Sequence, residues 1–219
     1  MEEIEEIKVE KGLREIKDEV VNCRKCSLYE ERIKNGFYPV IGEGNHQAKI
    51  LFCGEAPGLQ EAKTGRPFCG AAGKILDELL ESVGIKREDV YITNILKDRP
   101  PENRDPQPEE IKACVPYLER QIEIIKPEVI CPLGRFAMEF LMEKFGLKEQ
   151  IQGISKIHGK IFEPQVITEN IQSSLFEQKR REIKKIKIIP FYHPAVGIYN
   201  PHMKNILLQD FKVLKKIKK

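Results

Sequence analysis

Two kinds of residue in this chain are arranged as chemistry would require. Cys23 and Cys26 form a pair of thiols two residues apart, a spacing typical of metal sites. A run rich in glycine and proline follows a short apolar segment and extends from Gly54 to Gly73. Glycine lets a backbone approach a ligand closely and proline fixes its path, so this run predicts a rigid pocket. We expect the function to lie in that pocket.

Three further side chains suit a flat, polar ligand. Phe68 offers an aromatic face among glycines and prolines. Asn94 lies inside an apolar run, where an unpaired amide is costly, so it needs partners. His193 follows an apolar run and precedes Pro194, which stiffens the backbone and aims the ring. The ordinary alternatives are a core phenylalanine, an asparagine bonded to a strand end and a structural histidine.

Strands and helices alternate along the chain and should position these residues. The apolar runs predict strands at residues 50–53, 90–96, 128–132 and 186–192. The helical patterns cover residues 1–22, 74–83, 108–125 and 135–145 and a C-terminal stretch after 201. This alternation predicts an α/β fold, a three-layer α/β/α sandwich with a short, mostly parallel central sheet. Ligands of such sheets bind at the carboxyl ends of the strands, where the Gly/Pro run begins.

We expect a single domain over residues 1–219, with irregular loops at 99–106 and 193–201. A polar, charged stretch around 163–186 has no firm pattern and is interpreted as an insertion. Pro116 should weaken or kink one turn of its helix. The apolar face of the first helix should consist of Leu13, Ile16, Val20 and Val21.

Composition narrows the class of protein. The formal net charge is only +3, although lysines crowd the C-terminus, where they either stay solvated or contact phosphate. No apolar stretch is long enough to span a membrane and no secretory signal is visible, so we expect a soluble, cytoplasmic protein. Six cysteines in such a chain favour thiols or metal ligands over disulfides. The abundance of Lys, Glu and Ile is compatible with a thermophilic source.

The order and spacing of these motifs resemble the family 4 uracil-DNA glycosylases, the thermostable iron–sulfur branch of the uracil-DNA glycosylase superfamily. The resemblance runs from Cys23 to about Pro201. Its most specific motifs are Gly54-Glu55-Ala56-Pro57-Gly58, Glu61, Gly65, Pro67-Phe68, Gly70, Asn94, Pro100-Pro101, Asn103-Arg104-Asp105-Pro106 and His193-Pro194.

The resemblance implies a monofunctional DNA repair glycosylase that hydrolyses the N-glycosidic bond of uracil and leaves an abasic site. It would act as a monomer on single- or double-stranded uracil-containing DNA. Uracil would bind against Gly54, Ala56, Phe68 and Asn94. The Asn94 amide can accept from uracil N3–H and donate to O4, and cytosine presents the reverse pattern at these positions.

The resemblance also implies the catalytic groups. His193 would stabilise the negative charge that grows on uracil O2 as the bond breaks. Glu55 and Glu61 are the candidates for orienting water on the sugar side. Glu61 could instead exclude the thymine methyl group or simply be solvated, and the sequence does not divide these roles.

A loop from Ala195 to Pro201 resembles the segment that enters the minor groove of DNA. Ile198 is the candidate for an apolar wedge, and Tyr199 could stack on a base where the family commonly has Arg. An exposed hydrophobic side chain without a role is the alternative. Arg104 completes the predicted DNA-binding set.

Members of this family hold a [4Fe-4S] cluster with four cysteines. Cys23, Cys26 and Cys114 match three of them, and Asp98 occupies the remaining place. The possible outcomes are a cluster with Asp98 on its labile iron, which we favour, a three-iron cluster or a damaged site. Zinc is a weaker alternative, because no second close cysteine pair accompanies the first. The other cysteines, interpreted as core thiols, are Cys53, Cys69 and Cys131.

Three other functions compete with this interpretation. A broader glycosylase for deaminated bases is disfavoured because Glu55 and Asn94 match the uracil-selective branch. An inactive iron–sulfur DNA-binding module remains open because of Asp98. Dinucleotide binding is poorly supported, since the Gly54-x-x-x-Gly58 spacing differs from the fingerprint that brings a helix to pyrophosphate.

Overall fold

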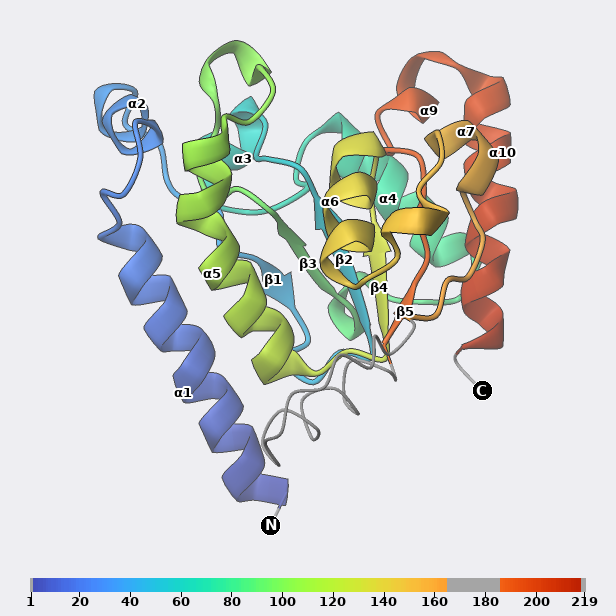
Figure 1. Cartoon of the computed structure of the whole chain (residues 1–219), viewed down its shortest axis with the longest axis horizontal. Helices are drawn as coiled ribbons and strands as arrows, with labels where there is room; N and C mark the ends of the chain where they lie inside the picture. Colours follow the sequence, from blue (N-terminus) through green and yellow to red (C-terminus); the bar gives the residue numbers. More distant parts are fainter. Residues whose placement is uncertain (1, 165–185, 218–219) are drawn as a thin grey trace.

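The central sheet has the predicted, mostly parallel arrangement. A computed structural model describes residues 2–164 and 186–217. Within these residues the sheet is five-stranded, with the order β1-β3-β2-β4-β5 (Figure 1). Only the β1–β3 pair is antiparallel among the neighbouring strands of this part of the chain. The strands are β1 (Glu43–Gly44), β2 (Ile50–Gly54), β3 (Tyr91–Asn94), β4 (Val129–Pro132) and β5 (Lys187–Ile188).

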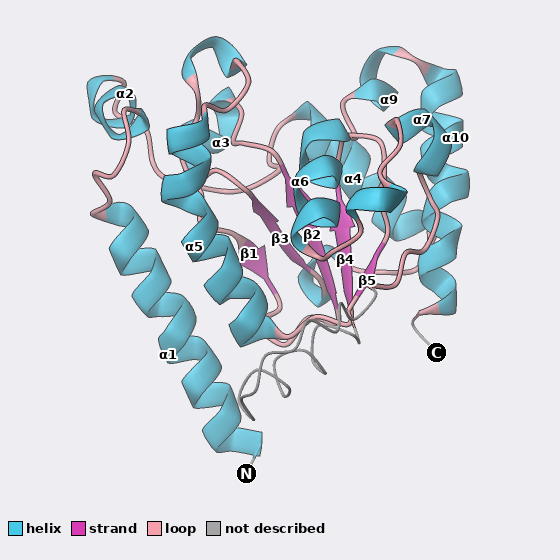
Figure 2. Ribbon diagram, viewed as in Figure 1, coloured by secondary structure: helices cyan, strands magenta, loops and turns pink. Residues whose placement is uncertain are grey.

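Helices surround this sheet (Figure 2). The α-helices of the described residues are α1 (Glu2–Val21), α2 (Leu28–Lys34), α3 (Leu59–Thr64), α4 (Ala71–Ser82), α5 (Pro108–Ile125), α6 (Arg135–Lys144), α7 (Ile154–Ile157), α9 (Val196–Tyr199) and α10 (Pro201–Phe211). Short 3-10 helices are η1 (Arg87–Asp89), η2 (Pro101–Asn103), η3 (Lys148–Gln150) and η4 (Lys212–Lys216). None of these helices combines the length and apolar character needed to cross a membrane.

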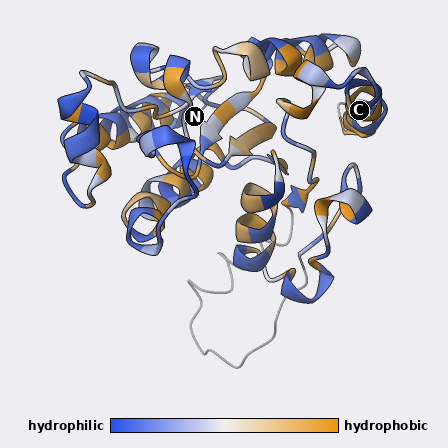
Figure 3. Cartoon of the chain, turned by 90° about the horizontal axis from the view of Figure 1, so that it is seen from above, coloured by the Kyte–Doolittle hydropathy of each residue, from blue (hydrophilic) through white to orange (hydrophobic). Residues whose placement is uncertain are grey.

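Alternating residues of β2 separate the hydrophobic core into two halves. Leu51 and Cys53 pack with residues of α1, α5 and α6, whereas Ile50 and Phe52 pack with residues of α4 and α10. Seen from above, the strands near the centre are coloured toward the hydrophobic end (Figure 3). This arrangement confirms the predicted helix–sheet–helix layering.

The chain changes direction across the sheet at β2. β3 lies on one side of β2 and β4 on the other, and α4 and α5 make the connections on opposite faces. In open α/β sheets such a switch point leaves a crevice at the carboxyl ends of the strands. Gly54 ends β2 and Asn94 ends β3, and the two residues are paired in register. The fold therefore places both predicted base-binding residues at this crevice.

The structure corrects several predicted boundaries. The loop predicted at 193–201 contains α9, and the segment predicted as irregular at 99–106 contains η2. The strand predicted at 186–192 is reduced to β5 and an isolated bridge at Phe191. α9, η2 and β5 are too short to show a hydrophobic period in the sequence. The same holds for α2, α3, α7 and β1, which were not predicted.

One residue of the long helices, Val21, differs from the prediction. Val21 is 47% exposed, because α1 ends there and the chain turns away toward Cys23. α5 runs unbroken through Pro116, which is exposed. On that side water can bond the carbonyl that loses its helical partner, so the proline is tolerated. Most of the predicted insertion at 163–186 lies outside the described residues.

Candidate active site

Gly54 is the point at which the predicted pocket residues meet. A Cβ atom at Gly54 would lie 2.3 Å from Oδ1 of Asn94 and 2.9 Å from Cζ of Phe68. Both distances are far below van der Waals contact, so any side chain here would displace the asparagine or the aromatic ring. The absence of a side chain at Gly54 thus allows an amide and an aromatic face to approach the same spot.

The turn that carries Phe68 is held tightly from both sides. Phe68 has a φ of 46°, a left-handed conformation that is unusual for an aromatic residue. Its carbonyl oxygen would lie only 1.7 Å from a Cβ atom at Gly73, so α4 can start against this turn only with glycine there. Oε1 of Glu61 accepts a hydrogen bond from the Gly70 N–H at 3.2 Å. Strain maintained in this way is characteristic of binding sites.

His193 lies beside the Phe68 ring. The two ring centroids are 5.6 Å apart and the planes are inclined by 32°. Nδ1 of His193 accepts a hydrogen bond from the Ala195 N–H at 3.2 Å. In the neutral ring Nε2 therefore carries the proton and can donate. Burial lowers the pKa of His193, and the charge of Glu61 opposes that shift, so the neutral form is favoured.

Asn94 is only 2% exposed. Its main-chain carbonyl accepts a hydrogen bond from Nζ of Lys97 at 2.8 Å. This contact supplies a partner for the main chain, and the base as partner of the side-chain amide stays a prediction. The amide oxygen points to the space beside Gly54.

Glu55 and Glu61 occupy different surroundings. Glu55 follows β2 directly and is partly buried, and burial together with the charge of Asp105 raises the pKa of its carboxyl group, while Arg135 opposes the shift. The Leu96 N–H donates to the Glu55 carbonyl at 3.0 Å and fixes its backbone. Glu61 lies on α3 and is already bonded to the turn before α4. Of these two glutamates, Glu55 directly follows the carboxyl end of β2. Its carboxylate accepts no hydrogen bond within residues 2–164 and 186–217, whereas that of Glu61 does.

Two of the cysteines predicted as metal ligands, Cys26 and Cys114, form a corner next to this loop, and Cys23 packs against the adjacent core cluster of α1 and α5. Cys26 and Cys114 pack in a small apolar cluster with Leu28 and Leu96, and Ala56 of the pocket loop packs against the same cluster. The Lys97 N–H donates to Sγ of Cys114 at 3.5 Å. The corner and the pocket thus share packing contacts.

Asp98 reaches the same corner but is engaged in an ion pair. Both of its carboxylate oxygens lie 3.2 Å from Nη1 of Arg32. Arg32 is 3% exposed and also donates to the carbonyls of Val20, Val21 and Cys23. Within residues 2–164 and 186–217, no three His, Cys, Asp or Glu side chains are grouped closely enough to hold a single metal ion. Ligation by Asp98 stays a prediction.

The predicted DNA-binding residues differ in how accessible they are. Tyr199 is 90% exposed at the end of α9. Ile198 is partly buried and packs against the core cluster of α4 and α10. Arg104 is bound through its guanidinium to the buried Glu110, with Nη1 and Oε2 3.0 Å apart. A DNA phosphate would have to compete with this pair for Arg104.

Two charged residues of this region were missed by sequence reasoning. Arg32 and Lys97 are 3% and 1% exposed, respectively. A lysine directly after the apolar run Ile95-Leu96 was a signal that could have identified Lys97. Arg32 offered no such signal, because it lies in the charged run Glu30-Glu31-Arg32-Ile33-Lys34 rather than in an apolar one.

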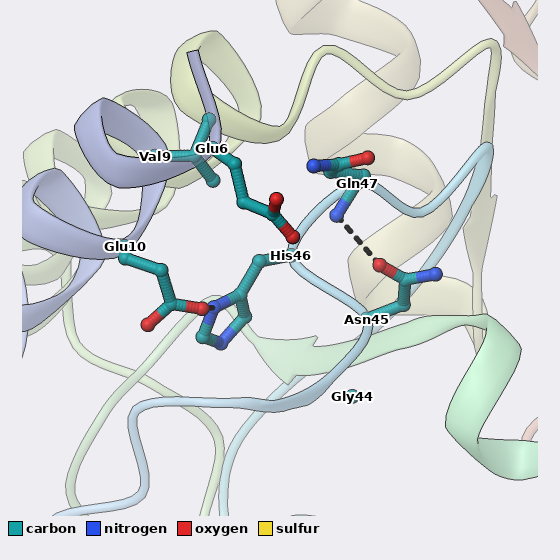
Figure 4. A pocket seen from close by; sticks show the side chains of 7 residues that line it. All are labelled: Glu6, Val9, Glu10, Gly44, Asn45, His46 and Gln47. Carbon is teal, nitrogen blue, oxygen red and sulfur yellow. Dashed lines mark hydrogen bonds and ion pairs between the residues drawn. The ribbon is translucent and has the colours of Figure 1, made fainter. Parts of the chain in front are cut away.

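A separate hollow of about 410 Å³ lies between α1 and the loop after β1 (Figure 4). Its carboxylates come from Glu6 and Glu10, and Glu10 pairs with Nδ1 of His46 at 2.6 Å. The loop leads into the amino end of β2, whereas the candidate site lies at the carboxyl end of that strand. The hollow is therefore at the opposite end of the strands. It makes no contribution to the candidate site.

Known proteins are similar to this chain in sequence. Residues 41–212 match the family model described as the uracil DNA glycosylase superfamily. A type-4 uracil-DNA glycosylase of Sulfurisphaera tokodaii is 43% identical over 207 residues, which cover 94% of this chain and 84% of that protein. A type-4 uracil-DNA glycosylase of Archaeoglobus fulgidus is 46% identical over 201 residues, covering 92% and 90%. The type-4 enzyme of Thermotoga maritima is 39% identical over 202 residues, covering 91% of each chain.

Proposed function

The chain belongs to the type-4 uracil-DNA glycosylases of the uracil-DNA glycosylase superfamily, and on this premise we propose how its residues act in DNA repair. The enzyme breaks the bond between uracil N1 and C1′ of the sugar. The bonding electron pair leaves with uracil, and water adds to C1′ to give an abasic site. The observation that supports this chemistry most directly is the meeting of Asn94 and Phe68 at Gly54. Uracil release from defined oligonucleotides tests it.

The pocket binds the base after the nucleotide has left the stack. Extrusion from duplex DNA costs a few kcal/mol, which contacts inside the pocket must offset. Phe68 stacks on the flat ring, and the Asn94 amide bonds N3–H and O4 of uracil. Any side chain at position 54 would displace the Asn94 amide or the Phe68 ring, so glycine is needed for both to face the base. A base with a donor at position 4, such as cytosine, would leave the amide with the wrong pairing.

His193 acts on the leaving group as a neutral donor. Its Nε2–H is directed by the bond that Nδ1 accepts from the Ala195 N–H. As the glycosidic bond lengthens, negative charge develops on uracil O2, and a preorganised donor stabilises it. The uracil anion then takes a proton from solvent. The lowered pKa favours the neutral imidazole, in which Nδ1 accepts from the Ala195 N–H and Nε2–H is the donor.

Glu55 and Glu61 have different roles in this proposal. Glu55 borders the crevice, and its carboxylate orients the attacking water and stabilises the positive charge on the sugar. Glu61 is a positioning residue, because its carboxylate braces the Gly70 N–H and so the turn that carries Phe68. The backbone around Glu55 is fixed by the bond from Leu96, which suits a group that must hold water in one place.

The sequence predicted Ile198 as the wedge; because Ile198 packs against the core whereas Tyr199 is 90% exposed, we propose that Tyr199 instead fills the gap that the extruded nucleotide leaves in duplex DNA. We expect Tyr199→Ala to slow uracil release from duplex DNA by about tenfold, the lower range for loss of one stacked aromatic ring. Release from single-stranded DNA should stay within about twofold, because no gap has to be filled there. Single-turnover rates on two strands of the same sequence measure the effect.

Ile198→Ala is the matched control for Tyr199. Because Ile198 packs on the core, its truncation should lower the melting temperature and affect both substrates alike. Equal losses on single- and double-stranded DNA after Tyr199→Ala would contradict the proposed role of Tyr199.

The residues of the cysteine corner fit an iron–sulfur cluster in chemical type. Thiols are the preferred ligands of such clusters, and a cluster holds its ligands farther apart than one metal ion does. Cys23, Cys26 and Cys114 would provide thiolates, whereas Arg32 competes for the carboxylate of Asp98. The cluster would supply no step of the reaction. Its role would be structural. Ala56 of the loop after β2 packs against the apolar side chains that surround Cys114, so a group bound there would help to hold the loop.

The iron content tests this assignment. Protein purified without oxygen should be brown and hold about four irons per chain, and exposure to air should reduce this to about three. Asp98→Cys should keep about four irons in air, because a fourth thiolate then holds the labile iron. Cys131→Ala, which removes a buried thiol of β4 outside the corner, should leave the iron unchanged. A colourless, zinc-loaded protein would contradict the cluster.

A further inference from the structure

Lys97 is a buried cation next to the base-reading strand. It is 1% exposed, and its ammonium group is in contact with four oxygen atoms. Nζ donates at 2.8 Å to Asn94 O, Thr93 Oγ1 and Gln121 Oε1 and approaches Ile41 O at 3.3 Å. A buried ammonium is tolerated only when its N–H groups are bonded, so these oxygens must stay in place.

The neighbouring groups are oriented so that they accept from Lys97. The Thr93 hydroxyl donates to Ile41 O at 2.7 Å, and Nε2 of Gln121 donates to Ile41 O and to the Tyr91 hydroxyl. The Thr93 and Gln121 oxygens are thereby left to accept. Together with the Asn94 carbonyl they match the three N–H groups of the ammonium. This match fixes the position of the Asn94 carbonyl from within the core.

The main chain of Lys97 is also held. Its N–H donates to Sγ of Cys114 and its carbonyl accepts from the Val40 N–H at 2.7 Å. Lys97 therefore connects the cysteine corner to the last residue of β3. Lys97 thus touches the corner with its main-chain N–H and Asn94 with its ammonium group.

We propose that Lys97 is a positioning residue that aims the Asn94 amide at the base by holding the Asn94 peptide group. The inference rests on the proposed function, because it requires Asn94 to read uracil. The carbonyl oxygen that Lys97 holds is two bonds from the Asn94 Cα, so this contact, together with the pairing of Asn94 with Gly54 in the sheet, restrains the peptide plane from which the side chain extends. A displacement of about 1 Å in a reacting group can cost about 100-fold in rate.

Lys97→Met tests the proposal, because it keeps the length of the side chain and removes the ammonium. We expect single-turnover uracil release to fall by about 10- to 100-fold at a temperature at which the variant is folded. The affinity for free uracil should fall with it, and discrimination against cytosine should weaken. Met142→Ala is the matched control: it truncates a buried side chain in the last turn of α6 and leaves every contact of the Lys97 ammonium in place. It should lower the melting temperature while the rate stays within about threefold.

A double-mutant cycle separates positioning from general destabilisation. In an Asn94→Ala background, Lys97→Met should reduce the residual rate by less than about threefold, because the side chain it aims is gone. An equal loss in both backgrounds, or a rate within about threefold of wild type for Lys97→Met alone, would overturn the inference. If Lys97→Met does not fold, Lys97→Gln enters the same cycle with the same expected results. A folded wild-type protein that releases no uracil would overturn the proposed function and this inference with it.

Discussion

Replacing His193 with alanine should slow uracil release by about 100- to 1,000-fold, the loss expected when one preorganised donor to a developing oxyanion is removed. The ring lies beside Phe68, and its Nδ1 is occupied by the Ala195 N–H, so Nε2–H is the group that can donate to uracil O2. The measurement is the single-turnover rate on a uracil-containing oligonucleotide. Binding to the same DNA should persist, because the contact strengthens only as the glycosidic bond breaks.

His46→Ala provides the control for this substitution. His46 pairs with Glu10 near the amino end of β2, at the opposite end of the strands from His193. Its loss should therefore leave the rate of uracil release unchanged. Near-full activity of the folded His193→Ala variant would remove His193 from the mechanism.

Asn94→Asp should change which base is released. A buried aspartic acid favours its neutral form, which can donate to cytosine N3 and accept from the cytosine amino group. Sites that pair every polar group of their ligand discriminate strongly, so the uracil-to-cytosine ratio of release rates should fall by at least about 100-fold. The two rates are measured on oligonucleotides that differ only at the target base.

Asn94→Ala is the comparison that separates recognition from simple damage. It should slow uracil release without creating activity on cytosine, because it offers no group to either base. If Asn94→Asp slows release but leaves the ratio unchanged, the amide does not read the base edge.

The sequence was most informative for glycines, polar residues and aromatic residues that lie in or next to apolar or Gly/Pro runs, because few structural roles fit them there. Gly54 ends an apolar run, so its place at the carboxyl edge of the sheet could be predicted, whereas Asn94 lies inside the run 90–96 and only the structure ends β3 there, paired with Gly54. Phe68 was identified by its Gly/Pro surroundings. Its left-handed backbone was not predicted, since it follows from contacts with Gly73 and with Glu61 through Gly70.

Contacts between distant segments could not be predicted. The Arg32–Asp98 pair joins residues 66 positions apart, and neither sequence neighbourhood indicates the other. Gln121 meets Lys97 from α5, 24 positions away. The short helices α3 and α9 escaped prediction because four to six residues do not establish a helical period. Glu61 and Tyr199 could therefore be named as candidates from the sequence, but the helices that carry them could not be predicted.

Uracil release from matched single- and double-stranded oligonucleotides that carry one uracil, one hypoxanthine or one thymine mismatch tests the central claim most directly. Alkali cleavage of the resulting abasic sites reports each reaction. We predict cleavage at uracil alone, on both kinds of substrate. Cleavage at hypoxanthine as well would indicate a broader glycosylase for deaminated bases. No cleavage by folded, iron-loaded protein that still binds DNA would contradict the account and indicate an inactive DNA-binding module.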